Sequence, residues 1–391
     1  MKVAFITHYC THYRIKTYEA LARRADVSFF FFSAGREWYW DASHGVSRGD
    51  FNHEYLSGFQ VGRTRIAPSL VFKLMRPYDA YIKCINGKFA LPLTYIVARL
   101  RGRPFILWTG LWIRLQTRTH RLLWPLTRYI YRNADAIVTY GTHVAEFLER
   151  EGVPSERLFP ARHALDNEAF RRHVDEEEKA ALRSRLGLRS EDKIVLYVGR
   201  LVEIKGLEYV LQAFARVASQ AVLVLAGQGP LEHKLREQAA DLGIADRVRF
   251  AGYVPTSDTV PFYSIAWVHV LTSVTTGAGR AGEGRETWGL VVNEAFNQGV
   301  PSIASDATGA AAGGLVQDGE TGLIVPERDV DALSSALARV LADEDLRNRL
   351  GQNARERVSE WTNESMAGTF MDAVWFAVSA RRREQLEARS S

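Results

Sequence analysis

The sequence predicts an α/β protein with two Rossmann-like domains facing each other across a cleft. Three observations predict two such domains: short apolar runs alternate with helical patterns, the alternation occurs twice, and a charged stretch separates the two series. The chain has 391 residues, 47% hydrophobic and 24% charged, which excludes collagen, coiled coil and a disordered chain. A single core rarely grows to this size, so two domains are expected.

The first β/α series occupies residues 1–165. Its expected strands are apolar runs without strict alternation, the pattern of parallel strands covered on both faces, at 2–7, 27–32, 78–85, 103–108 and 135–141. Helices are expected where apolar residues recur three or four positions apart, at 14–24, 91–101 and 143–152. This repeated order of strand and helix predicts a doubly wound sheet.

The second series occupies residues 193–365, after a charged stretch at 166–192 that is expected to be a linker with a solvated helix. Its strands are expected at 193–200, 221–227, 247–253, 267–273 and 301–306, and its helices at 207–218, 230–243, 288–299 and 330–343. The tail, 366–391, has apolar residues at helical spacing. We expect a packed helix that crosses back and completes the first domain; a partner-binding helix is the alternative.

The net charge of +5 conceals two halves of opposite sign. Residues 1–150 contain 22 Lys and Arg but 10 Asp and Glu, a net charge of +12, and the remainder carries −7. This asymmetry indicates a polyanionic partner for the first half: nucleic acid, an anionic membrane surface or a phosphorylated substrate. No nucleic-acid-binding module accompanies the charge, so nucleic acid is not expected.

The most basic stretch runs from Arg99 to Arg132, with eight Arg and no acid. It also contains Trp108, Trp112 and Trp124, and aromatic rings with arginines suit a peripheral membrane face. A buried strand flanked by basic surface loops is the alternative. With two cysteines and no apolar run long enough to span a membrane, the chain is expected in the cytoplasm, with peripheral contact to the cytoplasmic membrane face.

The strongest local signal is a pair of glutamates eight residues apart, Glu286 and Glu294. Gly289 lies between them where a loop becomes a helix, so the amides of Gly289, Leu290 and Val291 are expected at a helix N-terminus. Such amides form an anion site suited to a diphosphate, and each carboxylate can accept hydrogen bonds from sugar hydroxyls. Two glutamates alone favour a plainer interpretation, an amphipathic helix with solvated side chains.

Two glycine-containing turns follow predicted strands on the same edge of the sheet. GRLVEIKG begins at Gly199 and puts Arg200 and Lys205 in the loop before a helix, where two cations can neutralise a phosphate leaving group. AGQGP, which contains Gly227, is weak alone. The shared edge is more informative than any one pattern.

In this order, Gly-Arg-Leu-x-x-x-Lys-Gly, Ala-Gly-x-Gly-Pro and Glu-x7-Glu, with Glu-Ala and Gly-x-Pro after them, resemble family 4 of the retaining glycosyltransferases, also called glycosyl transferases group 1. That family has the GT-B fold. The resemblance covers 193–343 closely and the first half in outline, and 306–326 looks like the family's segment after the acidic motif. It implies transfer of a sugar from a nucleotide donor with retained anomeric configuration.

The resemblance also implies roles for individual residues. Arg200 and Lys205 would bind the diphosphate and stabilise the leaving group, and Glu286 would bind hydroxyls of the donor sugar; these are the expected catalytic residues. The other residues expected around the donor are Glu294 at the ribose, Tyr253 and Val254 near the base, and the backbone of Gly199, Gly227, Gly289, Leu290 and Val291.

The family implies no metal and no other cofactor, because cationic side chains and helix dipoles supply the positive charge. Two Asp-x-Asp triplets, at 329–331 and 343–345, lie at the ends of one late helix and are expected to be solvated helix ends. Arg280 and Arg285, in the loop before the first glutamate, are expected either to touch the donor or to be solvated.

The first half departs from the family in two places. The loop after the first strand reads THYCTHYR where the family often has glycines, so His8, His12 and Arg14 are acceptor-side candidates, with a surface turn as the alternative. Many members have a histidine where this chain has Trp108 and Thr109, which are therefore also assigned to the acceptor side.

These patterns lead us to expect a metal-independent retaining hexosyltransferase of polysaccharide biosynthesis. Its donor is expected to be UDP-linked rather than GDP-linked, and its acceptor a glycan, a lipid-linked sugar or another small molecule. A sugar-nucleotide epimerase or a phosphorylase of the same fold is one alternative. A non-enzymic basic module that binds membrane or nucleic acid is another.

Overall fold

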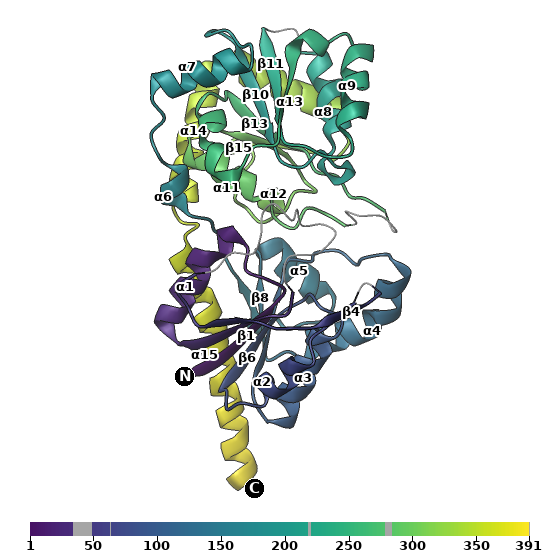
Figure 1. Ribbon diagram of the computed structural model, residues 1–391, viewed down its shortest axis with the longest axis vertical. Helices are drawn as coiled ribbons and strands as arrows, with labels where there is room; N and C mark the ends of the chain where they lie inside the picture. Colours follow the sequence, from purple (N-terminus) through teal and green to yellow (C-terminus); the bar gives the residue numbers. More distant parts are fainter. Residues whose placement is uncertain (34–48, 63, 218–219, 278–283, 391) are drawn as a thin grey trace. The chain divides into compact units, whose positions relative to one another are not determined.

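The computed structural model describes residues 1–33, 49–62, 64–217, 220–277 and 284–390 (Figure 1). The chain forms two compact units. Unit 1 comprises Met1–Trp112, Arg118–Leu165 and Asn363–Ser391, and unit 2 comprises Ile113–Thr117 and Asp166–Thr362.

Unit 1 is built on a parallel sheet of seven strands in the order β3-β2-β1-β6-β7-β8-β9. The strands are β1 (Lys2–Thr7), β2 (Asp26–Phe31), β3 (His53–Tyr55), β6 (Ala80–Cys84), β7 (Phe105–Thr109), β8 (Ala136–Thr139) and β9 (Leu158–Pro160). The strand order reverses between β1 and β6, as in doubly wound folds. Every residue of β6, β7 and β8 is buried, which explains their continuous apolar sequences.

Helices cover both faces of this sheet: α1 (Ile15–Arg24), α2 (Ser69–Leu74), α3 (Ala90–Leu100), α4 (Arg118–Asn133), α5 (Thr142–Arg150) and α15 (Asn363–Ser390). Two ring contacts assign α3 and α15 to opposite faces. Tyr95 of α3 lies edge-on to Phe105 at 5.2 Å between ring centroids, whereas Phe370 of α15 lies 5.3 Å from Trp108. Phe105 and Trp108 are three positions apart on β7 and therefore point to opposite faces.

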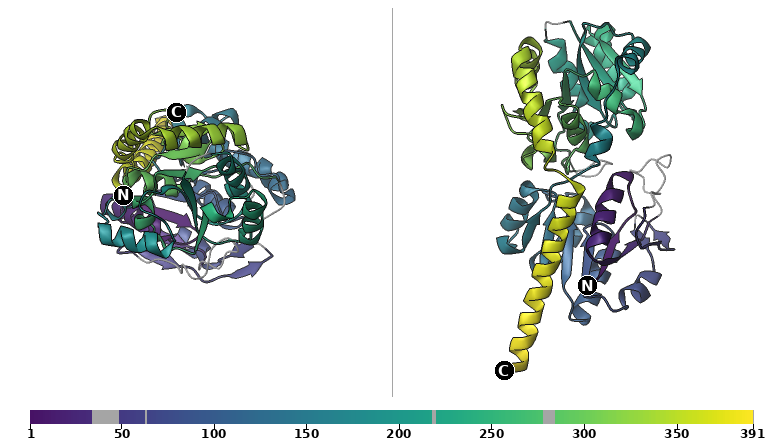
Figure 2. Two further views of the ribbon diagram at one scale, coloured as in Figure 1. Left: turned by 90° about the horizontal axis from the view of Figure 1, so that it is seen from above. Right: turned by 90° about the vertical axis from the view of Figure 1, so that its left-hand side faces the viewer.

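The C-terminal helix α15 supplies part of the core of unit 1, as expected for a helix that returns to the first domain. Met366, Phe370 and Val374 are buried in the same cluster as Phe5 and Trp108. In Figure 2, α15 is the long yellow helix that runs beside the strands of unit 1.

Unit 2 repeats the same arrangement with six parallel strands, in the order β12-β11-β10-β13-β14-β15. The strands are β10 (Lys193–Val198), β11 (Ala221–Ala226), β12 (Val248–Gly252), β13 (Val268–Leu271), β14 (Ser302–Ser305) and β15 (Gly322–Val325). The order reverses between β10 and β13. Two doubly wound parallel sheets confirm the predicted fold class.

The helices of unit 2 are α6 (Asn167–Phe170), α7 (Glu176–Arg185), α8 (Leu207–Ala215), α9 (Glu232–Asp241), α10 (Val260–Ser264), α11 (Leu290–Asn297), α12 (Gly309–Ala312), α13 (Val330–Ala342) and α14 (Glu344–Val358). The structure corrects the expected linker at 166–192, which belongs to unit 2. Leu182 and Leu188 are buried in the same core cluster as Ile194 and Leu196. The other side chains of this stretch are mainly charged, so its composition alone did not predict that these two leucines pack into the core of unit 2.

The basic stretch that begins at Arg99 also differs from the expectation. Much of it is the helix α4, and Trp108 and Trp112 are buried, 3% and 8% exposed, so neither ring is available to a membrane. Other elements without a clear sequence signal are the hairpin of β4 (Phe59–Val61) and β5 (Thr64–Ile66), and the helices α2 and α14.

Candidate active site

The loops that follow β10 and β13 bring the predicted catalytic residues of unit 2 together. These strands are neighbours at the reversal of the strand order, where a doubly wound sheet leaves room for a ligand at its C-terminal edge. The amide of Val274 donates to the carbonyl of Ile204 over 2.8 Å and joins the two loops. Lys205 therefore comes from the loop after β10, and Glu286 comes from the segment between β13 and α11.

Lys205 and Glu286 form an ion pair at this edge. Their side chains are only 12% and 17% exposed, and the hydroxyl of Ser273 donates to the same carboxylate oxygen over 3.3 Å. Burial acts to raise the pKa of Glu286, but the charge and hydrogen bond of Lys205 outweigh it and hold the pKa below its ordinary value. Glu286 is therefore ionised, and a carboxylate is an acceptor of hydrogen bonds from hydroxyl groups.

Arg200 lies in the same loop as Lys205 but is used differently. Its side chain is exposed and makes no hydrogen bond or ion pair with the described part of the chain. The loop beneath it is held by Tyr197, whose hydroxyl donates to the carbonyl of Arg200 over 2.7 Å. A fixed backbone with an uncommitted guanidinium is suited to a phosphate group, which accepts bidentate hydrogen bonds from arginine.

The helix α11 begins directly after Gly289, which adopts φ +97° and ψ +67°. A side chain at this position would also collide with Leu271, because its Cβ would lie 2.5 Å from the Cδ2 atom. Only glycine combines this left-handed backbone with such a close approach. The amides of Leu290 and Val291, in the first turn of α11, have no acceptor within the helix and present the positive end of its dipole.

Glu294 lies on α11, one turn after these amides, and is almost fully buried. Tyr263 of α10 donates a hydrogen bond to its Oε2 atom over 2.9 Å. Burial raises the pKa of Glu294 to about 7, although hydrogen bonds from Tyr263 and Thr259 act to lower it. The carboxyl group is consequently divided between its charged and neutral forms near neutral pH.

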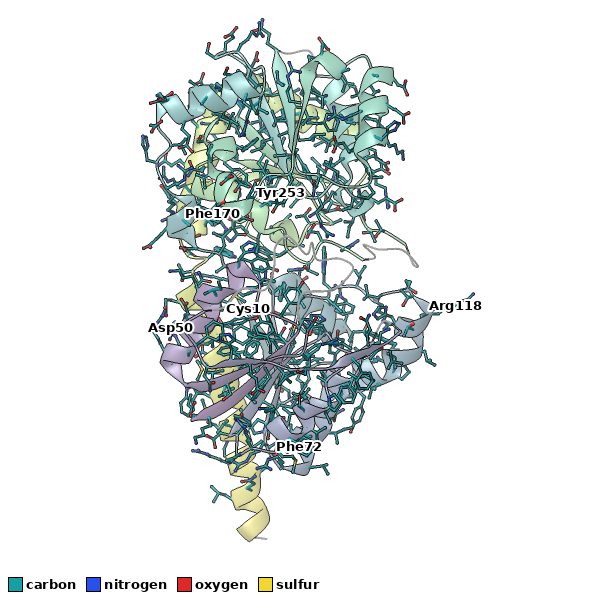
Figure 3. All side chains as sticks on the ribbon, in the orientation of Figure 1. Cys10, Asp50, Phe72, Arg118, Phe170 and Tyr253 are labelled. Carbon is teal, nitrogen blue, oxygen red and sulfur yellow. The ribbon has the colours of Figure 1, made fainter. Side chains whose placement is uncertain are left out.

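The remaining donor residues predicted from the sequence end two other strands on the same edge. Gly227 follows β11 with φ +154°, and a Cβ there would lie 1.8 Å from the carbonyl oxygen of Gly199. Gly227 also bridges to Gly252 of β12. Tyr253, 43% exposed, comes directly after β12, and Val254 is partly buried against the core of unit 2. Figure 3 labels Tyr253 in this part of unit 2.

Several residues at this site had no sequence motif to reveal them. Ser273 supports Glu286, Tyr263 supports Glu294, and Thr308 holds the loop before α11 by donating to the carbonyl of Leu271 over 2.9 Å. Ser273 is the last residue of the strand predicted at 267–273, which is the one weak signal it carries.

The other acidic and basic candidates of unit 2 have structural partners. Asp329 and Asp343 accept hydrogen bonds from the amides of Ala332 and Leu346, each over 2.8 Å, and so cap α13 and α14 as expected of helix ends. Arg285 donates to the hydroxyl of Thr275 over 2.8 Å. Arg280 lies outside the described residues.

In unit 1, the loop after β1 places His8 and His12 at the C-terminal edge of the sheet. The ring of His8 packs 5.1 Å from that of Phe32, and burial, with the nearby charge of Lys83, lowers the pKa of His8 to about 3. His8 is therefore neutral. His12 is exposed on a short 3-10 turn. Both remain candidates for the acceptor side.

The other three acceptor-side candidates are buried inside unit 1. Arg14, 3% exposed, donates to Nδ1 of His163 over 2.9 Å and lies 5.0 Å from the ring centre of Trp108. Thr109 is also buried, and its hydroxyl accepts a hydrogen bond from the amide of Leu111 over 3.2 Å. Arg14, Trp108 and Thr109 thus help to build the edge of the sheet and do not reach the surface.

Sequence comparison matches residues 178–357 to the family of glycosyl transferases group 1. A GDP-mannose-dependent alpha-(1-6)-phosphatidylinositol monomannoside mannosyltransferase of Mycobacterium tuberculosis is 31% identical over 296 residues, which are 72% of this chain and 73% of the relative. The chain belongs to the group 1 glycosyltransferases. It is an enzyme that transfers a sugar, as the resemblance of its motifs implied.

A second relative and two solved structures extend the comparison. The alpha-D-kanosaminyltransferase of Streptomyces kanamyceticus is 28% identical over 283 residues, 69% of this chain and 70% of the relative. Among solved structures, Anabaena HepE in complex with UDP has a TM-score of 0.74 at 17% identity, covering 96% of this chain and 99% of its own. Sucrose-phosphate synthase from Thermosynechococcus elongatus has a TM-score of 0.70 at 23% identity, with both chains covered completely. At these identities the structures support the fold.

Proposed function

We propose that this glycosyltransferase moves a sugar from a nucleotide-diphosphate donor to a glycan or lipid-linked acceptor and retains the configuration of the anomeric carbon. The observation that carries the proposal is the C-terminal edge of unit 2. An ionised Glu286, the cations Arg200 and Lys205 and the first turn of α11 are brought together there by loops at one reversal of strand order.

The charges at this edge match those of a nucleotide sugar. The diphosphate would lie against the amides of Leu290 and Val291, with Arg200 and Lys205 neutralising the negative charge that grows as the glycosidic bond to the phosphate breaks. Glu286 would hold the sugar by its hydroxyls, and Glu294, deeper along α11, would accept from the ribose. The leaving nucleotide keeps both electrons of the broken bond, and these cations stabilise it in that state.

The donor nucleotide is the first point to test. The UDP preference predicted from the sequence has no support among the curated relatives, of which the mycobacterial mannosyltransferase is named for GDP-mannose. We therefore propose that GDP-mannose be compared directly with UDP-linked hexoses. Release of the nucleotide in the presence of lipid and carbohydrate acceptors, with products identified by mass spectrometry, identifies the donor.

The central experiment compares Glu286→Gln with a matched control, Glu237→Gln, whose side chain is 64% exposed on α9. We expect Glu286→Gln to reduce donor turnover about 100-fold. The amide nitrogen of glutamine cannot accept a hydrogen bond from a sugar hydroxyl, and Lys205 loses its negatively charged partner. Glu237→Gln should behave as wild type. If Glu286→Gln turns over every donor at the wild-type rate, the proposed site is wrong.

Retention and metal independence need their own measurements. Proton NMR of the new glycoside should show the anomeric configuration of the donor, and an inverted product would contradict retention. Because Arg200 and Lys205 supply positive charge, we propose that a chelator leaves the rate unchanged. A donor epimer without transfer would indicate an epimerase, and phosphate-dependent cleavage of a glycoside would indicate a phosphorylase.

A further inference from the structure

Helix α4 of unit 1 presents an apolar stripe to solvent. Leu122, Leu126 and Tyr129 are 80%, 45% and 55% exposed, and their spacing of four and three residues puts them on one side of the helix. Ile130 and Tyr131 occupy the buried side. A surface helix normally turns polar residues outward, so this stripe requires a partner or another explanation.

The stripe continues across α3, which lies beside α4, and then across α2, which lies beside α3. Ile96 and Leu100 of α3 are exposed and four residues apart, and the ring of Tyr95 lies edge-on to Tyr129 of α4 at 6.0 Å. At the other side of α3, Arg101 donates to the carbonyl of Met75 at the end of α2 over 2.9 Å. Figure 1 shows the three helices in this order, and Figure 3 labels Phe72 on α2 and Arg118 at the start of α4. We call the exposed set the apolar face: Phe72, Met75, Ile96, Leu100, Leu122, Leu126 and Tyr129.

The charged residues on the helices of the apolar face are all positive. Helices α2, α3 and α4 contain no acidic residue, and between residues 56 and 134 Asp79 is the single acid. Arg118 and Arg121 are exposed on α4 beside Leu122. Exposed aliphatic and aromatic side chains flanked by arginines, with no acid among them, complement a surface that is apolar inside and negatively charged at its rim.

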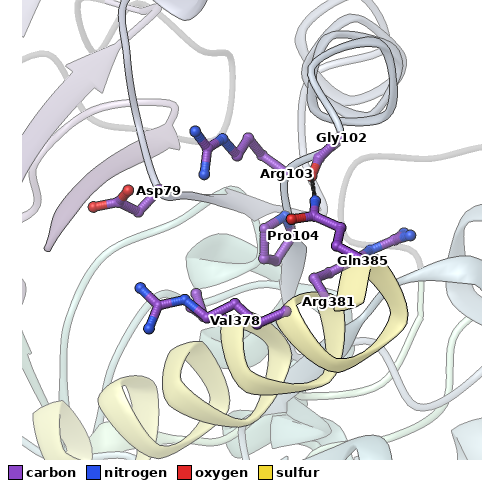
Figure 4. Close-up of a pocket in the computed structure, with 8 residues that line it drawn as sticks. Asp79, Gly102, Arg103, Pro104, Val378, Arg381 and Gln385 are labelled. Atoms are coloured by element: carbon purple, nitrogen blue, oxygen red, sulfur yellow. Dashed lines mark hydrogen bonds between the residues drawn. The ribbon is translucent and has the colours of Figure 1, made fainter. Parts of the chain in front are cut away.

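Hollows next to the apolar face carry further arginines. An open groove of about 700 Å³ is lined by Ile96, Leu100 and Tyr129, by the cations Arg99, Arg157 and Arg381, and by the acids Asp135, Glu156 and Glu384. Arg99 and Arg381 both pair with Asp135. A smaller hollow of about 30 Å³ lies beyond the end of α3 (Figure 4). Its exposed cations are Arg103 and Arg382, whose side chains make no hydrogen bond or ion pair within the described residues.

We propose that the apolar face docks on a lipid bilayer that contains anionic headgroups. The aliphatic and aromatic side chains would enter the interface, and Arg103, Arg118 and Arg121 would meet headgroup phosphates. No helix within the described residues has the length and apolar character needed to cross a bilayer. The proposal goes beyond the transferase chemistry, because it concerns the surface on which the enzyme works.

Flotation of the full chain with vesicles tests this directly. We expect flotation with vesicles of phosphatidylcholine and phosphatidylglycerol, and less with phosphatidylcholine alone. The triple variant Leu122→Ser, Leu126→Ser, Tyr129→Ser should bind the anionic vesicles at least about tenfold more weakly, because it removes the stripe of α4. Wild-type binding by this variant, or no flotation of the wild type with either vesicle, would overturn the proposal.

A matched apolar control lies on the opposite face of the sheet. Trp375 of α15 is 52% exposed, and α15 covers the face that α3 does not. Trp375→Ser also replaces an exposed apolar residue by serine, yet it should float as wild type does. Equal losses for Trp375→Ser and the triple variant would indicate nonspecific adsorption and contradict a defined face.

The charged part of the proposal has a separate control. The double variant Arg118→Gln, Arg121→Gln should lose most of the preference for anionic vesicles, with a weaker salt dependence. Arg349→Gln, Arg355→Gln changes two exposed arginines of α14 in unit 2 and should retain it. An unchanged anionic preference in the first variant would contradict the headgroup contacts. Nucleotide binding, measured in the same preparations, reports on unit 2 and separates this outcome from failure of the proposed function.

Discussion

The two units share one strand order but use its point of reversal differently. In unit 2, the loop after β10 begins and ends with glycine, and Lys205 at this edge is paired with the carboxylate of Glu286. In unit 1, the loop after β1 is filled by aromatic and histidine side chains, and Lys83 of the neighbouring β6 is completely buried. Its ammonium donates to the carbonyls of Cys84 and Asn86, each over 2.6 Å.

The comparison shows that the strand order creates a possible ligand site at the reversal point of each sheet. The volume of the side chains there decides whether that site stays open. Glycines keep the edge of unit 2 open, so its cations can serve a ligand. Bulky residues close the corresponding edge of unit 1, so its central lysine contacts backbone carbonyls and pairs with no carboxylate among the described residues. Five substitutions test this comparison.

The largest effect is expected from removing the cation of the open edge. Lys205→Ala should lower the rate of donor turnover about 100- to 1000-fold, because a preorganised charge next to the leaving group is lost and Glu286 is left without its partner. Lys234→Ala, at an exposed lysine of α9, is the control. Similar rates for both variants would mean that Lys205 serves only the fold.

The sequence was sufficient to predict which residues gather at this edge, because Arg200, Lys205, Glu286 and Gly289 each stand in a motif directly after a strand or before a helix. It was not sufficient to predict that Lys205 binds Glu286, which is 81 residues away. Such pairs depend on which strands become neighbours.

The same limit applies more strongly to unit 1. Apolar runs predicted its strands, but an apolar stripe on α4 does not reveal whether it points inward or to solvent, and a basic composition concealed the helix itself. Trp108 and Arg14 are acceptor-side candidates because they lie where this chain departs from the family pattern. Their burial follows from contacts with α15 and His163, far away in the sequence.

The second-largest effect is expected from replacing Gly289, which should lower the affinity of unit 2 for the nucleotide. Gly289→Ala forces a side chain into a left-handed backbone and against Leu271, so the start of α11 must move. We expect nucleotide affinity, measured by calorimetry, to fall about 10- to 100-fold. Gly243→Ala is the matched control, because Gly243 also has a positive φ, +67°, but no atom within 4 Å of an added Cβ. Equal losses of affinity would attribute the effect to general strain.

The closed edge of unit 1 should respond to pH through Lys83. Burial lowers the pKa of Lys83 from 10.5 to about 7, so between these values the unfolded chain holds a proton that the folded chain lacks. The free energy of unfolding of the wild type, relative to that of a variant that lacks only Lys83, must therefore rise with pH across this window, by up to about 1.4 kcal/mol per pH unit.

Chemical denaturation of wild type and Lys83→Met from pH 7 to pH 9 measures this difference. Lys88→Met, at an exposed lysine of the following loop, should stay parallel to wild type throughout. If Lys83→Met also stays parallel, the ammonium of Lys83 is not shielded from water and the contrast between the two edges disappears.

The smallest effect concerns the tuning of Glu294 in the open edge. With a pKa of about 7, this carboxyl group loses its proton as pH rises from 6 to 8, and the charged form accepts hydroxyl hydrogen bonds better. Nucleotide affinity should therefore rise a few-fold over this range. Glu294→Gln should remove this rise and leave only the titration of the nucleotide itself.

Tyr263→Phe removes a hydrogen-bond donor that favours the charged form of Glu294, so the pKa of this group should move up and the rise in affinity should shift to higher pH. A merely structural role for Tyr263 would lower affinity equally at every pH. Tyr209→Phe, on α8, serves as the control and should reproduce the wild-type profile. An unshifted profile in Tyr263→Phe would show that burial alone sets the pKa of Glu294, and that the open edge of unit 2 is tuned by its core and not by this hydrogen bond.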